Sequence, residues 1–316
     1  MFAHQLQSGE SADFNVEAPF YYAQATAFVF PAILFALLSL IALAVNYFFQ
    51  QYPGNNYLQA NFFLLGSDLF LMYVGSIFLQ GRCGVLPLII KEVTYYFIVL
   101  ALGCLATTAV QFTPFPPIDQ HILAVESFFH VDTHALLTWT NTKPLLKTVL
   151  EIAYASLMYQ MLCIPLVLVI AGRIDLLREH YFLILTSALI GFVFYYFFPT
   201  TAPASVINSI YFNESQRATY LKFFQIHYYI QPTTMDGGMI ALPSFHVIWA
   251  WLCLRLLREW KVAFSVLLLI NLTIVASCVL LGWHYCLDVM GSVVVIVLSH
   301  ALYRTCIKFK SRSARV

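Results

Sequence analysis

Charged residues are scarce in this sequence. Lys, Arg, Asp and Glu make up 10% of its 316 residues, against about 25% in an ordinary soluble domain. Hydrophobic residues make up 61%, and a soluble protein of this length could not bury that much apolar surface in its core. The formal net charge of +1 leaves no basic face to meet phosphates. The composition therefore indicates a membrane protein that has no nucleic-acid partner.

The sequence also lacks a metal-binding pattern. Its seven cysteines are scattered through apolar runs without paired spacing, so we interpret them as small core residues. We find no internal repeat and no low-complexity linker, and a single membrane domain is the simplest interpretation. We expect neither a metal nor any other cofactor.

Long apolar runs, by contrast, are abundant. A helix that crosses a bilayer needs about 20 mostly apolar residues. Eight segments are candidates for such helices: 22–49, 57–79, 88–112, 147–171, 181–198, 244–259, 262–282 and 284–306. The predicted fold is all-α, a polytopic membrane bundle of about eight transmembrane helices.

Two long connections, 113–146 and 199–243, interrupt this pattern. The first opens with three prolines and then contains two short amphipathic pieces, 122–129 and 135–138. The second contains prolines and a Gly-Gly pair. Backbone that is not helical at membrane level must be covered by protein or line a wet cavity. Long loops also often carry function, so we expect the site between these connections and the last three helices.

The distribution of cations predicts the orientation. With eight crossings, both long connections lie on the side opposite the two termini. That side carries four of the sixteen Lys and Arg residues, and the other side carries twelve. Because cytoplasmic segments are enriched in cations, we expect both termini in the cytoplasm and the active site on the periplasmic or lumenal side.

Two polar stretches near the end of the sequence carry the candidate chemistry. His246 follows Pro243 and Ser244, which are typical of a helix start. The 38 residues from His246 to His284 make one round trip across the bilayer, so both histidines should emerge at the same surface. Asp288 comes four residues after His284, and on a helix the two side chains would share a face. A carboxylate beside an imidazole fixes its tautomer, as a histidine nucleophile requires.

The stretch Pro243 to His246, together with Ser277 to Gly291, resembles the second and third signature motifs of the type 2 phosphatidic acid phosphatase superfamily. The resemblance implies that the nucleophile becomes a phosphohistidine. It implies in addition that the aspartate orients this nucleophile, that the other histidine protonates the leaving oxygen, and that no metal takes part. By this resemblance, His284 would be the nucleophile, Asp288 the orienting acid and His246 the proton donor.

The resemblance also implies a division of the chain. Helices three to eight would match the six-helix core of that superfamily. We therefore expect an N-terminal tail with two accessory transmembrane helices in residues 1–83, a six-helix catalytic core in residues 84–308 and a basic cytoplasmic tail in residues 309–316.

The sequence departs from the family at the residues that bind phosphate. The first family motif is Lys, six residues, then Arg-Pro, but here Gly191 and Phe198 stand in place of the two cations. Cys278 stands where the third motif usually has Arg, and Phe245 replaces the usual glycine. In these respects the chain is similar to the inositolphosphotransferase-like branch, which contains inositolphosphoryl ceramide synthases and sphingomyelin synthase-like proteins.

The missing cations indicate the charge of the substrate. A phosphomonoester carries close to two negative charges near neutral pH, whereas a phosphodiester carries one. We therefore expect a phosphodiester and the transfer of a headgroup between membrane lipids. The phosphate would be bound by the start of the helix at Ser244 and by cations of the long connections. The candidate substrate-binding residues are Ser244, Phe245, Tyr285, Arg217, Lys222 and His227, with Lys143 and His134 as further cations.

Two alternatives remain open at this point. A lipid phosphate phosphatase would act on phosphatidic acid, sphingoid or polyprenyl phosphates and would release free phosphate. A non-catalytic lipid-binding or transport protein would tolerate changes of His246 and His284 without any effect on lipid turnover. The sequence names neither the headgroup, nor the acceptor, nor the oligomeric state.

Overall fold

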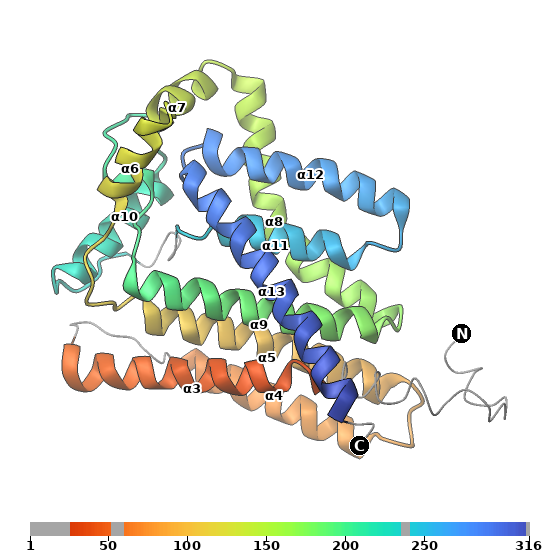
Figure 1. Ribbon diagram of the computed structural model, residues 1–316. Coiled ribbons are helices and arrows are strands. Elements are labelled where there is room, and N and C mark those ends of the chain that lie inside the picture. Colours follow the sequence, from red (N-terminus) through yellow and green to blue (C-terminus); the bar gives the residue numbers. More distant parts are fainter. Residues whose placement is uncertain (1–25, 52–59, 235–240, 314–316) are drawn as a thin grey trace.

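The computed structural model describes residues 26–51, 60–234 and 241–313, and these residues form helices and no strands (Figure 1). In chain order the elements are α3 (Val29–Val45), the π-helix η1 (Asn46–Gln50), α4 (Ala60–Phe78), α5 (Leu86–Val110), α6 (Asp119–Phe128), α7 (Thr133–Asn141), α8 (Pro144–Ile170), α9 (Ile174–Phe197), the 3-10 helix η2 (Pro203–Ser205), α10 (Glu214–His227), α11 (Phe245–Leu256), α12 (Lys261–Leu280) and α13 (Cys286–Ser313). The prediction of an all-α fold is confirmed.

Among the described residues, six helices are long and apolar enough to cross a bilayer: α3 with η1, α5, α8, α9, α12 and α13. Two shorter apolar helices, in α4 and α11, fall at the other two predicted spans. The 12 residues of α11 extend over only about 18 Å at 1.5 Å per residue, less than the roughly 30 Å of a hydrocarbon core. The multi-pass prediction is therefore supported, while the count of eight crossings is not established.

Ion pairs join the helix ends on one side of the bundle. Glu179 of α9 binds Arg255 at 2.6 Å and Arg258 at 2.8 Å, at the end of α11. Arg173, before α9, binds Glu259 at 2.5 Å. These contacts place the α8–α9 and α11–α12 turns together.

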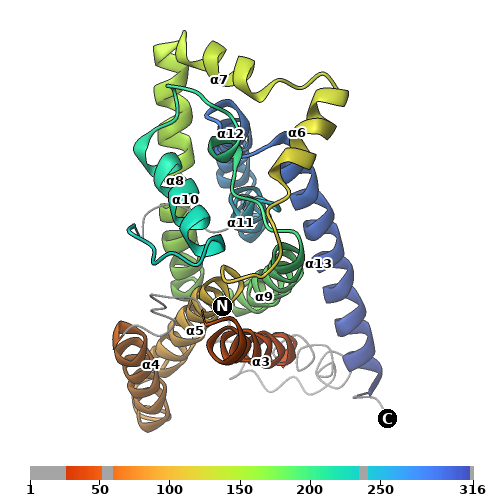
Figure 2. The same ribbon diagram turned by 90° about the vertical axis from the view of Figure 1, so that its left-hand side faces the viewer.

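The opposite side of the bundle is covered by α6, α7 and α10 (Figures 1 and 2). The two amphipathic pieces predicted in residues 113–146 correspond to α6 and α7. The two long connections touch where the backbone N–H of Ile118 donates to the carbonyl of Pro199 at 2.9 Å. The site described next lies beneath this cover.

The helix α9 runs through the centre of the bundle and packs against α3, α5, α8, α11 and α13 (Figure 2). It is largely apolar, and its Tyr181 and Tyr195 are completely buried. Helix α5 is joined to it by an ion pair between Arg178 and the fully buried Glu92, and the guanidinium also lies 4.9 Å from the ring centre of Phe28, just before α3. A single apolar core therefore extends from α3 to the site.

Candidate active site

The start of α11 places His246. The helix begins at Phe245, and Ser244 precedes it as its N-cap residue in an extended conformation. The backbone N–H of Ser244 donates to the carbonyl of Asp288 at 3.3 Å. The hydroxyl of Ser292 donates back to the carbonyl of Ser244 at 2.9 Å. The first turns of α11 and α13 are therefore held together, which brings the two sequence motifs to one place.

A tight turn between α12 and α13 places His284. Gly282 has a φ of +73°, a conformation that glycine adopts readily and that commonly ends a helix. The backbone N–H of His284 then folds back to the carbonyl of Cys278 at 2.8 Å. The sequence predicted that His284 and Asp288 share the face of one helix. This is wrong in detail, because α13 begins only at Cys286 and His284 lies in the turn before it.

His284 and Asp288 nevertheless form a hydrogen-bonded pair. The Nδ1 atom of His284 lies 3.2 Å from Oδ2 of Asp288 and 3.0 Å from the carbonyl oxygen of Ala241. The same Oδ2 accepts the backbone N–H of Tyr285 at 3.0 Å. Both partners of the imidazole are acceptors, so Nδ1 carries the proton in the neutral ring. The Nε2 atom is left with its lone pair, which is the form a nucleophilic imidazole requires.

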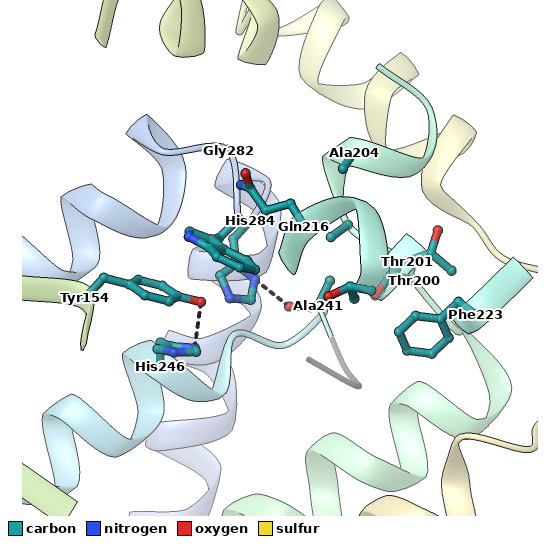
Figure 3. Close-up of a pocket in the computed structure, with 13 residues that line it drawn as sticks. Tyr154, Thr200, Thr201, Ala204, Gln216, Phe223, Ala241, His246, Gly282 and His284 are labelled. Atoms are coloured by element: carbon teal, nitrogen blue, oxygen red, sulfur yellow. Dashed lines mark hydrogen bonds between the residues drawn. The ribbon is translucent and has the colours of Figure 1, made fainter. Parts of the chain in front are cut away.

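His246 lies in a stack of three rings. Its ring is 4.1 Å from that of Tyr154, at an interplanar angle of 18°. On its other face, Tyr154 stacks on Trp283 at 5.2 Å and 8°. The hydroxyl of Tyr154 lies 3.3 Å from Nδ1 of His246 (Figure 3). The rings of His246 and His284 are 5.8 Å apart, which leaves room for a group that touches both.

The two histidines face a cavity of about 210 Å³ (Figure 3). Its walls come from α8, the connection after α9, α10, Ala241 ahead of α11, the first turn of α11 and the turn before α13. They are formed by Tyr154, Thr200, Thr201, Ala202, Ala204, Gln216, Thr219, Phe223, Ala241, His246, Gly282, Trp283 and His284. None of these described lining residues is a Lys, Arg, Asp or Glu. The cavity therefore offers neutral hydrogen-bonding groups and two imidazoles to a ligand.

Two buried carboxylates support the site from α6, and the sequence analysis did not identify either. Asp119 accepts hydrogen bonds from Thr201 and Tyr285. Burial raises the pKa of Asp119 to about 6, against the effect of these hydrogen bonds. Glu126 accepts the backbone N–H of Leu287 at 3.3 Å, and burial raises its pKa too. Both carboxylates therefore contact the motif around His284 from outside the cavity.

Three of the predicted substrate-binding side chains pack behind the cavity wall. The hydroxyl of Ser244 faces the sulfur of Cys278 at 3.9 Å. The ring of Phe245 packs on that of Phe192 at 4.9 Å, and the hydroxyl of Tyr285 donates to Asp119 at 3.0 Å. These contacts give the three residues supporting positions next to the two histidines.

The predicted cations lie at different distances from the cavity wall. Arg217 is exposed and borders a second hollow, of about 480 Å³, that shares Ala204 with the first. Lys222 is buried in α10. Burial lowers the pKa of His227 to about 4, so this side chain is neutral at pH 7. His134 and Lys143 are exposed. None of these five residues belongs to the described lining of the cavity that the two histidines face.

These features define a class of integral membrane protein with a candidate phosphoryl-transfer site: apolar helices long enough to cross a bilayer, two facing histidines and a buried aspartate. A family model described as the PAP2 superfamily matches residues 120–302, more than half of the chain. The chain belongs to the PAP2 superfamily, whose members are phosphatases and phosphotransferases. No curated protein and no solved structure matches it.

Proposed function

We propose that this protein is a lipid phosphotransferase that cleaves a lipid phosphodiester through a phosphohistidine on His284. One observation carries the proposal. The Nδ1 atom of His284 is engaged by Asp288 and by the carbonyl of Ala241, so Nε2 is the nitrogen available to the cavity that His246 also lines. A nucleophile oriented by an acid, with a second imidazole 5.8 Å away, is the arrangement that covalent catalysis with proton transfer needs.

The reaction proceeds in two steps. In the first, Nε2 of His284 attacks the phosphorus, and the bond from phosphorus to the leaving lipid alcohol breaks. Protonated His246 donates its proton to the departing oxygen, and Asp288 stabilises the positive charge on the phosphorylated ring. In the second, an acceptor alcohol passes its proton to His246 and attacks the phosphorus, and the bond from nitrogen to phosphorus breaks. The headgroup stays on the phosphorus throughout and is transferred to the acceptor.

The charge of the cavity supports a phosphodiester substrate. At 4 Å and an effective dielectric constant of 20, two unit charges interact by about 4 kcal/mol. When cations are missing, a dianionic phosphomonoester therefore loses more binding free energy than a monoanionic phosphodiester does. The described lining contains no Lys or Arg, so the positive charge that it offers to the substrate before the attack is that of protonated His246. Thr200 and Gln216 line the cavity and offer neutral hydrogen-bond donors that suit a single negative charge.

The depth and side of the site support a lipid substrate. Because α11 extends over only about 18 Å, His246 at its start lies at membrane level, beneath α6, α7 and α10. The opposite side of the bundle carries the ion pairs of Arg173, Arg255 and Arg258, consistent with a cytoplasmic location of that side. We place both termini in the cytoplasm and the cavity on the periplasmic or lumenal side, where it would receive lipids of the outer leaflet.

A lipid profile of membranes that express the wild type or His284→Ala tests the proposal. The membranes receive phosphatidylinositol, phosphatidylcholine, phosphatidylethanolamine, phosphatidic acid and polyprenyl pyrophosphate as donors, with diacylglycerol and ceramide as acceptors. We expect a new headgroup-bearing lipid with the wild type that is absent with His284→Ala. The matched control is His121→Ala, which removes an exposed histidine of α6 and should leave the product unchanged.

The other outcomes would replace the proposal with one of its alternatives. Free phosphate together with a dephosphorylated lipid would identify a phosphatase. Identical profiles for the wild type and both variants would identify a non-catalytic lipid-binding or transport protein.

A further inference from the structure

We propose that Asp119, at the start of α6, is a positioning residue that holds the wall of the catalytic cavity against the turn that carries His284. This inference rests on the proposed reaction at His284. Asp119 does not belong to the described lining of the cavity. It therefore acts through the residues that it binds.

A single carboxylate joins two distant segments. The backbone N–H of Thr201 donates to both oxygens of Asp119, at 3.0 and 2.9 Å, and the hydroxyl of Thr201 donates to Oδ2 at 3.1 Å. The hydroxyl of Tyr285 donates to Oδ1 at 3.0 Å. Asp119 is 2% exposed and Tyr285 is fully buried. Hydrogen bonds to an ionised acceptor are stronger than neutral ones, so this contact ties the two segments firmly.

The first segment forms a wall of the cavity. Thr200, Thr201 and Ala202 all line it. Ala202 has a φ of +72° and a ψ of +164°, a region that is essentially restricted to glycine. Such a conformation persists only where the surroundings hold it. Two contacts of the preceding residues hold it here. Thr201 donates its hydrogen bonds to Asp119, and Thr200 Oγ1 accepts the backbone N–H of Leu242 at 2.9 Å.

The second segment carries the nucleophile. Tyr285 directly follows His284, and its backbone N–H shares Oδ2 of Asp288 with Nδ1 of His284. A buried phenol that loses its acceptor leaves an unsatisfied group, which is unfavourable. Loss of the Asp119 carboxylate would therefore move Tyr285. The Tyr285 backbone, and with it the orientation of His284, would move too.

Glu126 shows which part of this arrangement is specific to Asp119. It lies near the other end of α6 and accepts the backbone N–H of Leu287 and the hydroxyl of Thr133. It therefore holds α6 against the start of α13. Its described hydrogen bonds do not reach the cavity wall at Thr200 to Ala202. A change at Glu126 perturbs the attachment of α6 to α13 but leaves the hydrogen bonds between Asp119 and the cavity wall in place, and this makes it a matched comparison.

The test compares the wild type, Asp119→Asn and Glu126→Gln as full-length proteins in proteoliposomes. Asn keeps the size of Asp119 but replaces one acceptor oxygen with a donor that faces Thr201 or Tyr285. We expect Asp119→Asn to lower kcat for lipid phosphoester cleavage 10- to 100-fold and to change KM less than threefold. We expect Glu126→Gln to lower kcat less than Asp119→Asn does, because it keeps an oxygen that can accept the Leu287 N–H and leaves the hydrogen bonds of Thr201 and Tyr285 in place. The double variant Asp119→Asn with Tyr285→Phe should be no slower than Asp119→Asn, since both changes break one connection.

A second measurement does not depend on turnover. Amide hydrogen exchange, followed by mass spectrometry, should become at least tenfold faster in residues 200–205 and 282–286 of Asp119→Asn, but not of Glu126→Gln. If exchange is faster in Asp119→Asn but the wild type shows no activity, the connection through Asp119 is upheld and the proposed function is overturned. If the wild type is active, a kcat of Asp119→Asn within threefold of the wild-type value would overturn the positioning role. Unchanged hydrogen exchange in Asp119→Asn would overturn it as well. So would a loss of kcat that only follows the fraction of folded protein.

Discussion

Phe245 fills the space beside Gly191. A Cβ atom added at residue 191 would lie 2.8 Å from Cζ of Phe245 and 3.0 Å from Cγ of Pro243. By the sequence resemblance, residue 191 corresponds to the lysine of the first family motif and residue 245 to a glycine of the second. The two departures from the family pattern are therefore complementary in space, since the ring at 245 requires the absence of a side chain at 191.

This complementarity predicts a coupling between the two positions. Gly191→Leu should destabilise the protein by about 1–3 kcal/mol through overpacking, and Phe245→Ala by about 3–5 kcal/mol through the cavity that it leaves. The double variant should lose less than the sum by at least about 1 kcal/mol, because the new side chain enters the vacated space. Thermal unfolding in detergent measures all three variants.

The control for this cycle is Gly103→Leu, a glycine of α5 with no atom within 4 Å of an added Cβ. Its effect should simply add to that of Phe245→Ala. If the Gly191 and Phe245 variants are additive as well, the two residues do not compete for one space.

The contact between His284 and Asp288 predicts a large loss of rate in Asp288→Asn. The amide has no charge to stabilise a positively charged, phosphorylated imidazole, and it can hold the ring in the wrong tautomer. By analogy with catalytic triads, the rate of lipid phosphoester cleavage should fall by about 10²- to 10⁴-fold. Ser292→Ala is the control, because this hydroxyl donates to backbone carbonyls at Asp288 and Ser244 and leaves the carboxylate untouched. A loss smaller than about tenfold in Asp288→Asn would remove Asp288 from the mechanism.

Features that arise from local patterns were predictable from the sequence. Long apolar runs identified the helices, and the round trip between His246 and His284 predicted that they meet. The helix α10 was missed, although Asn213 and Gln216 form a capping box at its start, a pattern that signals a helix N-terminus. The turn at Gly282 was missed as well, since a glycine between two apolar runs does not reveal its own φ.

Features that depend on distant contacts were not predictable. Asp119 meets Tyr285 across 166 residues, and Tyr154 meets His246 across 92. Nothing near Asp119 or Tyr154 in the sequence marks either partner, because both contacts arise only when α6 and α8 pack against the ends of α11 and α13. One sequence, without the packing of its helices, predicts candidate reacting groups but not the residues that hold them.

Tyr154 should contribute to the rate through its hydroxyl. Tyr154→Phe keeps the stack with His246 and Trp283 but removes the group 3.3 Å from Nδ1 of His246. In the proposed mechanism this contact orients the imidazole that transfers the proton, so kcat should fall about tenfold, within the range of acid–base effects, while KM stays within threefold. Tyr159→Phe, on an exposed part of the same helix, should have no effect. Equal rates for the two variants would show that the hydroxyl of Tyr154 is not used.

The raised pKa of Asp119 predicts opposite effects of acid on stability and on activity. Burial raises this pKa from 3.8 to about 6. The nearby charge of Asp288 adds to the rise, and the hydrogen bonds from Thr201 and Tyr285 oppose it. The carboxylate also interacts electrostatically with Tyr195 of α9. The folded protein therefore binds this proton more tightly than the unfolded chain does. The ionised carboxylate lowers stability above pH 6, and that cost diminishes as the pH falls toward 4.

Between pH 7 and pH 5, the wild type should therefore gain about 1 kcal/mol of stability relative to Asp119→Asn, a rise of roughly 2–4 °C in the difference between their melting temperatures. Over the same interval the kcat of the wild type should fall, because a protonated carboxyl cannot accept both the Thr201 and Tyr285 hydrogen bonds that hold the cavity wall against His284. Melting curves and kcat measured at pH 5, 6 and 7 check both effects. Parallel melting curves for the two proteins at all three pH values would show that Asp119 does not titrate in this range.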